Sequence, residues 1–266
     1  NSSIWRSTDD GGTWQQLDGT NLSSGFNQIF YLKESNLTNC STDARGNVLG
    51  WAASTGGYIY KTTDGGSSWN AIQAAPSFVT FYSVRFSDAK NGVAVGAFNS
   101  EGFIYYTQDG GLTWTQAAGY PIAQGPFIAV EYSDPNTVWV VSDFTLLIKS
   151  TDGGKTWTNI PVTSPTFTPT PNAASPNNVY FLDIFFSDAK TGWITTSRSR
   201  IYKTIDGGAT WNQTTVGFTL NYGSFSFLLP TNAVINESWF EPTGRIGYVV
   251  SFIAGRAAKS IDGGAT

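Results

Sequence analysis

The phrase KTTDGGSSW at residues 61–69 organises this chain, because close copies of it return from one end to the other. Each copy has a Ser or Thr, an Asp two residues later, two adjacent glycines and, in the five full copies, a Trp. The six aspartates are spaced 55, 45, 43, 54 and 56 residues apart. Periods of this length are typical of arrays of similar supersecondary units.

The copies supply the structural residues that we expect to matter most. They are Ser7, Asp9, Gly11 and Trp14; Thr62, Asp64, Gly66 and Trp69; Thr107, Asp109, Gly111 and Trp114; Ser150, Asp152, Gly154 and Trp157; Thr204, Asp206, Gly208 and Trp211; and Ser260, Asp262 and Gly264.

A second repeat lies upstream of these copies. VRFSDAKNGVAVG (84–96), VEYSDPNTVWVVS (130–142) and IFFSDAKTGWITT (184–196) align without a gap, and SWFEPTGRIGYVV (238–250) is a looser copy. Each unit thus predicts a strand, a turn, a second strand, a short loop, a third strand, the Asp-Gly-Gly turn and a fourth strand that Trp opens. No segment shows sustained helical periodicity.

These units predict an all-β fold, a β-propeller of four-stranded antiparallel blades, because sheets of this size cover their faces when they pack radially. We expect a single propeller domain over residues 1–266. Its ends read as incomplete blades, which predicts at least six blades and favours seven in a longer parent chain. The expected units cover about residues 1–18 (partial), 19–74, 75–118, 119–161, 162–215 and 216–266 (partial).

Every part of the repeated turn has a structural use. The Asp can accept backbone N–H groups two or three residues on, the hydroxyl can tie the other limb, and the glycines permit positive φ. The Trp buries an apolar surface between sheets, which contributes about 2–3 kcal/mol. Catalysis requires different groups that converge on one point, and one carboxylate per turn is too few ligands for Ca²⁺. The turns therefore predict architecture, with no catalytic residue, metal or cofactor.

Composition excludes several classes of function. The chain has no His, one Cys, 13% charged residues and a net charge of −4. Ser-His-Asp, Cys-His and His-bearing zinc sites are therefore absent. No stretch gathers basic residues, which argues against a nucleic-acid partner. The sequence also contains no run of 18 apolar residues, so it predicts no transmembrane segment.

The pattern Ser/Thr-x-Asp-x-Gly-x-Thr/Ser-Trp resembles the Asp box, or bacterial neuraminidase repeat, of the sortilin and sialidase superfamily of propellers. Within it, the chain is most similar to photosynthesis system II assembly factor-like propellers, through Phe86, Asp88, Gly92, Val95 and Gly96 and the equivalent Phe186, Asp188, Gly192 and Trp193. This resemblance implies a non-enzymatic scaffold that holds another protein. The arginine patch of those assembly factors has no matching segment here.

Enzymes in the same superfamily provide the alternative function. Sialidases carry an early Phe-Arg-Ile-Pro phrase that this chain lacks. Xyloglucan-type endoglucanases combine two propellers around two catalytic Asp residues, and this chain is compatible with a part of one. A glycoside hydrolase and a photosystem II assembly factor-like protein therefore stay open beside a binding propeller for proteins or glycans.

Three stretches are longer than the repeat requires, namely 33–46, 161–178 and 215–231. The last two lengthen successive blade-to-blade connectors, which lie on one face of a propeller together with the loops between second and third strands. We expect a partner to dock there, since apolar loops flanked by Arg are typical of interfaces; a local cap that folds onto the blade is the alternative. The candidate residues are Phe167, Arg198, Arg200, Phe218, Tyr222 and Phe225.

The remaining candidates concern the surroundings of the protein. We expect an extracellular or cell-surface location, with the periplasm or thylakoid lumen as the alternative. Cys40 is compatible with a free thiol and with a disulfide to another segment. Asp183, in a predicted innermost strand, either faces the channel or, as we prefer, is hydrogen-bonded within its strand. The sequons that permit N-glycosylation are at Asn1, Asn21, Asn36, Asn39, Asn212 and Asn236.

Overall fold

A computed structural model of the chain describes residues 5–6, 12–16, 25–32, 48–121, 125–143, 146–162, 180–196, 201–214, 237–240, 247–251 and 256–260. In these residues the regular secondary structure is entirely β. For the strands before residue 12 and after residue 236, only the backbone is described.

Four antiparallel sheets of four strands each follow one another along the chain. They are β3 (Phe26–Tyr31), β4 (Gly50–Ser54), β5 (Tyr58–Thr62) and β6 (Asn70–Gln73); β7 (Thr80–Phe86), β8 (Gly92–Phe98), β9 (Glu101–Thr107) and β10 (Thr115–Gln116); β11 (Phe127–Tyr132), β12 (Val138–Ser142), β13 (Leu147–Ser150) and β14 (Thr158–Asn159); and β15 (Phe181–Phe186), β16 (Gly192–Thr196), β17 (Ile201–Thr204) and β18 (Asn212–Thr214). Two smaller sheets flank them, β1 (Trp5–Arg6) with β2 (Gln15–Gln16), and β19 (Glu237–Phe240), β20 (Gly247–Ser251) and β21 (Arg256–Ser260).

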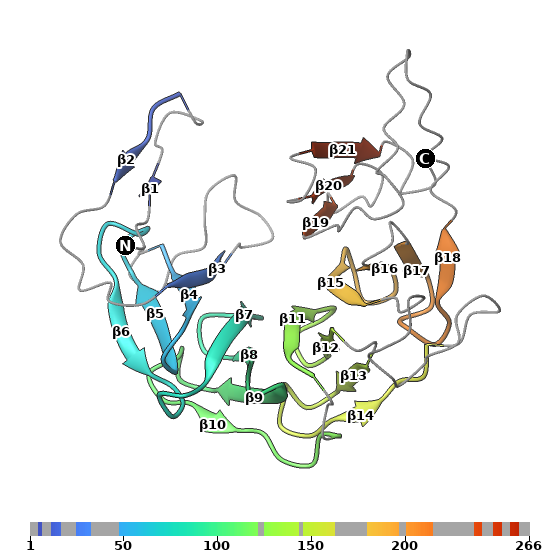
Figure 1. Ribbon diagram of the computed structural model, residues 1–266, viewed down its shortest axis with the longest axis horizontal. Coiled ribbons are helices and arrows are strands. Elements are labelled where there is room, and N and C mark those ends of the chain that lie inside the picture. Colours follow the sequence, from blue (N-terminus) through green and yellow to red (C-terminus); the bar gives the residue numbers. More distant parts are fainter. Residues whose placement is uncertain are drawn as a thin grey trace.

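The sheets are arranged in chain order around a common centre (Figure 1). The first strand of each sheet is innermost, and β3, β7, β11, β15 and β19 each contact the next in that order. The fourth strands lie at the periphery. This arrangement confirms the predicted all-β propeller fold.

The four sheets share one register as well as one strand order. Each innermost strand has an irregularity at the same place, between Phe26 and Gln28, Phe81 and Ser83, Phe127 and Ala129, and Phe181 and Asp183. A bulge of this kind adds a residue and increases the local twist. The repeat in the sequence is therefore a repeat of backbone geometry near the axis.

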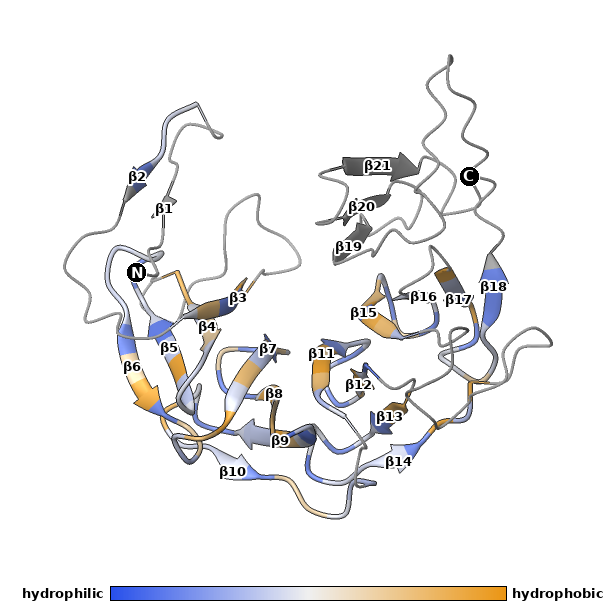
Figure 2. Ribbon diagram, in the orientation of Figure 1, coloured by the Kyte–Doolittle hydropathy of each residue, from blue (hydrophilic) through white to orange (hydrophobic). Residues whose placement is uncertain are grey.

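The core lies between the sheets. Trp51 of β4 stacks on Phe86 of β7 with ring centroids 3.6 Å apart, and Trp139 of β12 stacks on Phe186 of β15 at 5.1 Å. Both tryptophans are almost completely buried, so these pairs join consecutive sheets. The apolar colour in Figure 2 accordingly marks β11 and β15, whereas the peripheral β10, β14 and β18 are white to blue.

Candidate functional site

The Asp-box turn between β9 and β10 is closed by its own hydrogen bonds. Asp109 Oδ1 accepts the backbone N–H of Leu112 and of Thr113, both at 2.9 Å, while its Oδ2 accepts the Thr113 hydroxyl at 2.6 Å. The Thr107 hydroxyl donates to Asp109 Oδ1 at 2.8 Å and accepts the N–H of Gly111 at 2.9 Å. The N–H donors lie three and four residues after the Asp, one further along than we predicted from short Asx turns.

Three other turns repeat this arrangement around Asp64, Asp152 and Asp206. Burial alone would raise the pKa of Asp109 and Asp152, but hydrogen bonds from the following Thr and the preceding hydroxyl lower it to about 2. Hydrogen bonds, led by that of Thr210, also lower the pKa of Asp206 to about 2. These carboxylates are ionised at neutral pH and have no proton to donate as a general acid.

Two of these turns also accept hydrogen bonds from the preceding sheet. Trp51 Nε1 donates to the Gly110 carbonyl at 3.1 Å, and Lys149 Nζ donates to the Gly207 carbonyl at 3.5 Å. Each of the two turns therefore holds two sheets together in addition to closing one hairpin.

The tryptophans of the boxes differ in exposure. Trp69, Trp157 and Trp211 are buried, as we expected for rings between sheets, and Trp114 is partly buried. Trp14, however, is 61% exposed, so the expectation is wrong for this residue. Among the described strands, β1 and β2 chiefly contact each other, so no described sheet covers this ring.

A Trp–Lys pair that the sequence analysis did not predict lies next to the Asp-box turns. Trp139 pairs with Lys149 across β12 and β13, and Lys149 Nζ lies 4.6 Å from the Trp139 ring centroid, within cation–π range. Trp51 with Lys61 and Trp193 with Lys203 repeat the pair at 5.9 and 5.1 Å.

The sheet β7–β10 lacks this pair and shows how the sequence could have revealed it. Val93 and Tyr106 occupy the two paired positions there. Trp in the second strand and Lys directly before the box are thus present together in three sheets and absent together in the fourth.

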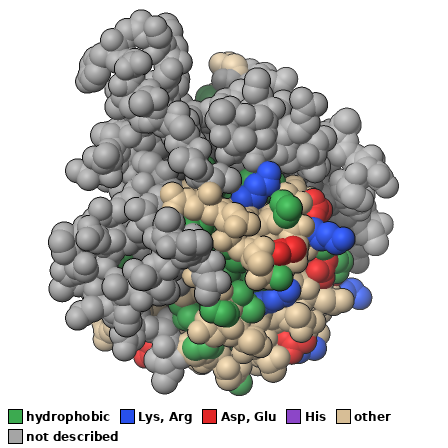
Figure 3. Space-filling model, turned by 90° about the vertical axis from the view of Figure 1, so that its right-hand side faces the viewer, with side chains coloured by type: hydrophobic (Ala, Val, Ile, Leu, Met, Phe, Trp, Pro, Cys, Tyr) green, Lys and Arg blue, Asp and Glu red, His purple; other side chains and the backbone are tan. Residues whose placement is uncertain are grey.

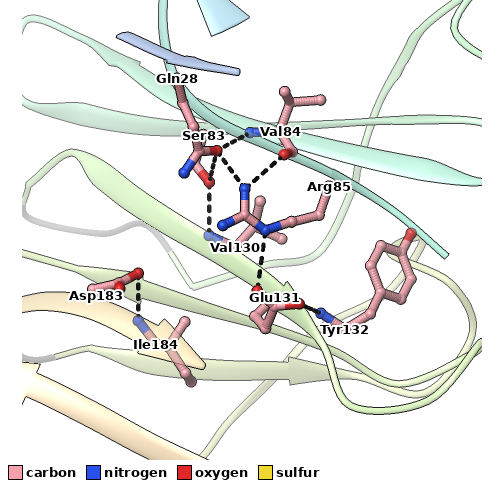
Figure 4. A network of polar contacts seen from close by, with 9 residues as sticks. All are labelled: Gln28, Ser83, Val84, Arg85, Val130, Glu131, Tyr132, Asp183 and Ile184. Atoms are coloured by element: carbon pink, nitrogen blue, oxygen red, sulfur yellow. Dashed lines mark hydrogen bonds and ion pairs between the residues drawn. The ribbon is translucent and has the colours of Figure 1, made fainter. Parts of the chain in front are cut away.

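A polar network joins the innermost strands near the axis (Figure 4). Arg85 of β7 pairs through Nε with Glu131 Oε2 of β11 at 3.0 Å, and its Nη1 donates to Gln28 Oε1 of β3 at 2.7 Å. Ser83 donates to the same Gln28 oxygen and accepts the N–H of Val130. Side chains of one strand thereby bond to the strands on both sides of it.

The two carboxylates of the innermost strands, Glu131 and Asp183, interact with neighbouring groups of the protein. Burial raises the pKa of Glu131, and the charge of Arg85 offsets part of that effect. Asp183 Oδ1 accepts the N–H of Ile184 at 2.9 Å, which agrees with the preferred interpretation of Asp183 as a hydrogen-bonded strand residue.

Besides Glu131, Asp143, which directly follows β12, is the described carboxyl group with a raised pKa. Burial raises its pKa to about 6, and no neighbouring charge contributes to the shift. Its Oδ1 is buried without a hydrogen-bond partner among the described residues. We had not singled out this residue, because nothing in DFTL indicates burial.

Many of the predicted residues lie outside the described part of the chain. Ser260 is in β21, where only the backbone is described, and Asn212 is exposed at the start of β18. The candidates that the structure does not describe are Phe167, Arg198, Arg200, Phe218, Tyr222 and Phe225; Asn1, Asn21, Asn36, Asn39, Asn236 and Cys40; and Ser7, Asp9, Gly11, Asp262 and Gly264.

The described residues contain no cluster of His, Cys, Asp and Glu that could hold a metal ion. They also form no helix of the length and apolarity needed to cross a bilayer. On the face shown in Figure 3, acidic and basic side chains of the described surface lie side by side, without an extended area of one sign.

Comparisons with known proteins agree with this architecture. A family model described as "Photosynthesis system II assembly factor YCF48" matches residues 72–173. The structure of YCF48 from Cyanidioschyzon merolae is 18% identical at a TM-score of 0.65, and the match covers 98% of this chain and 77% of that one. The GH74 enzyme of Niastella koreensis is 17% identical at a TM-score of 0.60, and the match covers 98% of this chain and 41% of that one.

A search of curated proteins found no significant match. At these identities the two structures establish the fold alone. Together with the family match and the Asp-box turns, they show that the chain is a β-propeller of the bacterial neuraminidase repeat type that resembles the photosystem II assembly factor.

Proposed function

We propose that this chain is a non-catalytic propeller that binds another protein and holds it within a larger assembly. The observation that carries the proposal is that the Asp-box carboxylates are hydrogen-bonded and ionised. Each of the four described ones is engaged by its own turn, with its pKa lowered. The description of the matching family as an assembly factor supports the same function.

We place the partner at the two lengthened connectors, residues 161–178 and 215–231, with Phe218 and Tyr222 as the principal contacts. Aromatic side chains flanked by Arg are a usual composition of interface centres. This proposal rests on the sequence, because residues 163–178 and 215–231 lie outside the described residues. Protein–glycan contacts at the same patch are the second form of binding that we consider.

A glycoside hydrolase is the second candidate function, because the chain resembles a GH74 enzyme in fold and Asp143 has a raised pKa. Glycosidases of the two main classes need two carboxyl groups, which lie about 5–9.5 Å apart. The pKa of Asp143 is raised by burial without a contribution from another carboxylate. Burial raises the pKa of structural and catalytic acids alike, so the pKa of Asp143 alone does not favour the hydrolase.

One experiment separates these two functions. We expect the purified chain to release no reducing ends from xyloglucan, other β-glucans or sialylated glycoproteins, measured over the pH range 4–8. A photoreactive residue introduced at Phe218 or Tyr222 should, in the producing cells, crosslink to a protein, whereas the same residue at the exposed Leu112 should not. Hydrolysis that the Asp143→Asn variant abolishes would show that the chain is an enzyme.

We further propose that binding takes place outside the cytoplasm, on a cell surface or in a periplasmic or lumenal space. The exposure of Asn212 in its Asn-Gln-Thr sequon supports a glycoprotein. Peptide N-glycosidase treatment of the native protein should remove mass at Asn212, and the Asn212→Gln variant should lack that mass. An unmodified Asn212 in protein recovered from its native source would contradict the glycoprotein proposal.

A further inference from the structure

The end of the sheets opposite the Asp-box turns carries exposed aromatic side chains. In an antiparallel sheet, the loops between second and third strands and the blade-to-blade connectors emerge at this same end. Phe78 of the connector before β7 is 49% exposed, and Phe98 at the end of β8 is 38% exposed. Both values are large for phenylalanine, which proteins usually bury.

These two rings form one surface. Their centroids are 4.6 Å apart, and Phe78 also packs edge-on against Phe103 of β9 at 6.4 Å. Phe98 is paired with Glu101 across the hairpin, so the Glu101 side chain projects on the same side as Phe98. We call Phe78, Phe98 and Glu101 the Phe78 surface.

A tight turn closes the hairpin that presents this surface. Asn99 and Ser100, its two turn residues, both have positive φ, 48° and 65°. Two positive values are typical of the tight type I′ turn, whose twist matches that of the paired strands. β8 and β9 have seven residues each, compared with five in β4 and β12, so regular pairing continues to Phe98 and Glu101.

Around the Phe78 surface, in the loops and connectors at this end of the sheets from β3 to β14, the charges are of one sign, whereas Arg198 and Arg200 follow in the loop after β16. The loops and connectors at 54–57, 74–80, 98–102, 117–126 and 143–146 contain two charged residues, Glu101 and Asp143, and both are acidic. The described lysines of the same sheets lie at the other end, in or next to the turns around Asp64, Asp88 and Asp152. Exposed rings beside an acid attract cations, through the face of the ring and through the carboxylate.

We propose that the Phe78 surface binds a protein segment that carries apolar side chains together with Lys or Arg. The inference rests on the proposed protein-binding function and names a second contact region, apart from the lengthened connectors. The apolar residues of the segment cover Phe78 and Phe98, and its cation pairs with Glu101. A partner with an acidic segment is disfavoured, because no Lys or Arg in these loops would neutralise it.

Fluorescence anisotropy with labelled decapeptides tests the proposal on the full chain. We expect an alternating Leu/Lys peptide to bind at least about tenfold more tightly than an alternating Leu/Glu or Ser/Lys peptide. The Phe78→Ser, Phe98→Ser double variant should weaken Leu/Lys binding about tenfold or more, as loss of an interface centre does. Glu101→Gln should weaken it about threefold and reduce its salt dependence.

The control variant is Leu112→Ser, Ile205→Ser, which removes two equally apolar and more exposed residues from the opposite end. It should bind the Leu/Lys peptide as the unchanged protein does. If the phenylalanine variant loses its fold, Glu101→Lys keeps the test decisive, because it should reverse the preference toward the Leu/Glu peptide.

Several results would overturn the inference. They are equal loss of binding in the control variant, unchanged binding in the Phe78 and Phe98 variant, and displacement of the peptide by a neutral oligosaccharide, which would indicate a glycan surface. A crosslinked protein partner together with no Leu/Lys binding would overturn this inference alone, whereas hydrolysis of a polysaccharide would overturn the proposed function.

Discussion

Replacing Gly154 with Ala is expected to lower the free energy of unfolding by about 3–5 kcal/mol. Gly154 has φ +98°, a conformation that costs an L-residue energy. A Cβ at this position would also overlap Val93 of the preceding sheet, which is fully buried. The substitution therefore combines backbone strain with overpacking at the contact between two sheets.

Gly153→Ala is the matched control for this prediction. Gly153 has φ +75° in the same turn, but a Cβ there would meet nothing within 4 Å. We expect about 1–2 kcal/mol of destabilisation, from backbone strain alone. Urea unfolding followed by tryptophan fluorescence measures both variants.

The cause can be isolated with Val93→Ala. This change removes the methyl group that a Cβ at Gly154 would strike, so Gly154→Ala should cost less in the Val93→Ala background than in the original chain. Equal losses for Gly153→Ala and Gly154→Ala, or full additivity with Val93→Ala, would contradict a steric contact between the sheets.

Gly208 provides a second copy of the experiment. Its φ is +82°, and a Cβ would overlap the ring of Trp139, which is almost completely buried against Phe186. We expect Gly208→Ala to destabilise at least as much as Gly154→Ala, because a buried indole ring has less freedom to move than a valine methyl group.

The second large effect concerns the ion pair between Arg85 and Glu131 of the innermost strands. Arg85→Met should lower the free energy of unfolding by about 2–4 kcal/mol at pH 8. The substitution keeps an apolar stem but leaves Glu131 without its cation. The side chains of Arg85 and Glu131 are only 19% and 16% exposed, so water replaces the lost partner poorly.

The loss should depend on pH in a defined direction. The pKa of Glu131 is already raised by burial, and Arg85 is the first of the contributions that lower it. Without Arg85 the folded-state pKa rises further above the unfolded value. A raised carboxyl pKa favours the folded state at low pH, and this advantage is lost as pH rises through the folded pKa. Arg85→Met should therefore be much less destabilising at pH 5 than at pH 8.

The double variant Arg85→Met, Glu131→Leu is the control, because it removes both charges. It should regain most of the stability that Arg85→Met loses at pH 8. Its own remaining loss of unfolding free energy, relative to the unchanged protein, should be the same at pH 5 and pH 8. Chemical unfolding at pH 5 and pH 8 measures the unfolding free energy of both variants. A loss of the same size at both pH values would rule out an uncompensated Glu131 charge as its cause.

The fold was predictable because its main signals are local. The hydrogen bonds of the Asp box join residues at most four positions apart, so Thr107, Asp109 and Thr113 carry the turn in their own sequence. Four such turns at a period near fifty residues, with strand patterns between them, specify a radial stack of small sheets.

The candidate sites were less predictable, for the same physical reason. Arg85 and Glu131 are 46 residues apart and Arg85 and Gln28 are 57 apart, so nothing local marks them as partners. The sequence around Phe78 does not distinguish it from the buried aromatic residues, and only the packing of neighbouring sheets leaves it exposed. The burial of Asp143 has no local signal either.

The amino-acid sequence by itself determined the strand pattern, the hairpin turns and the use of their carboxylates, because each depends on atoms within a few residues of one another. Tertiary structure alone decided which glycine meets which ring, which charges pair at the axis and which aromatic rings face solvent. These contacts join consecutive sheets across separations such as the 59 residues between Trp51 and Gly110, and only radial packing of the sheets sets them.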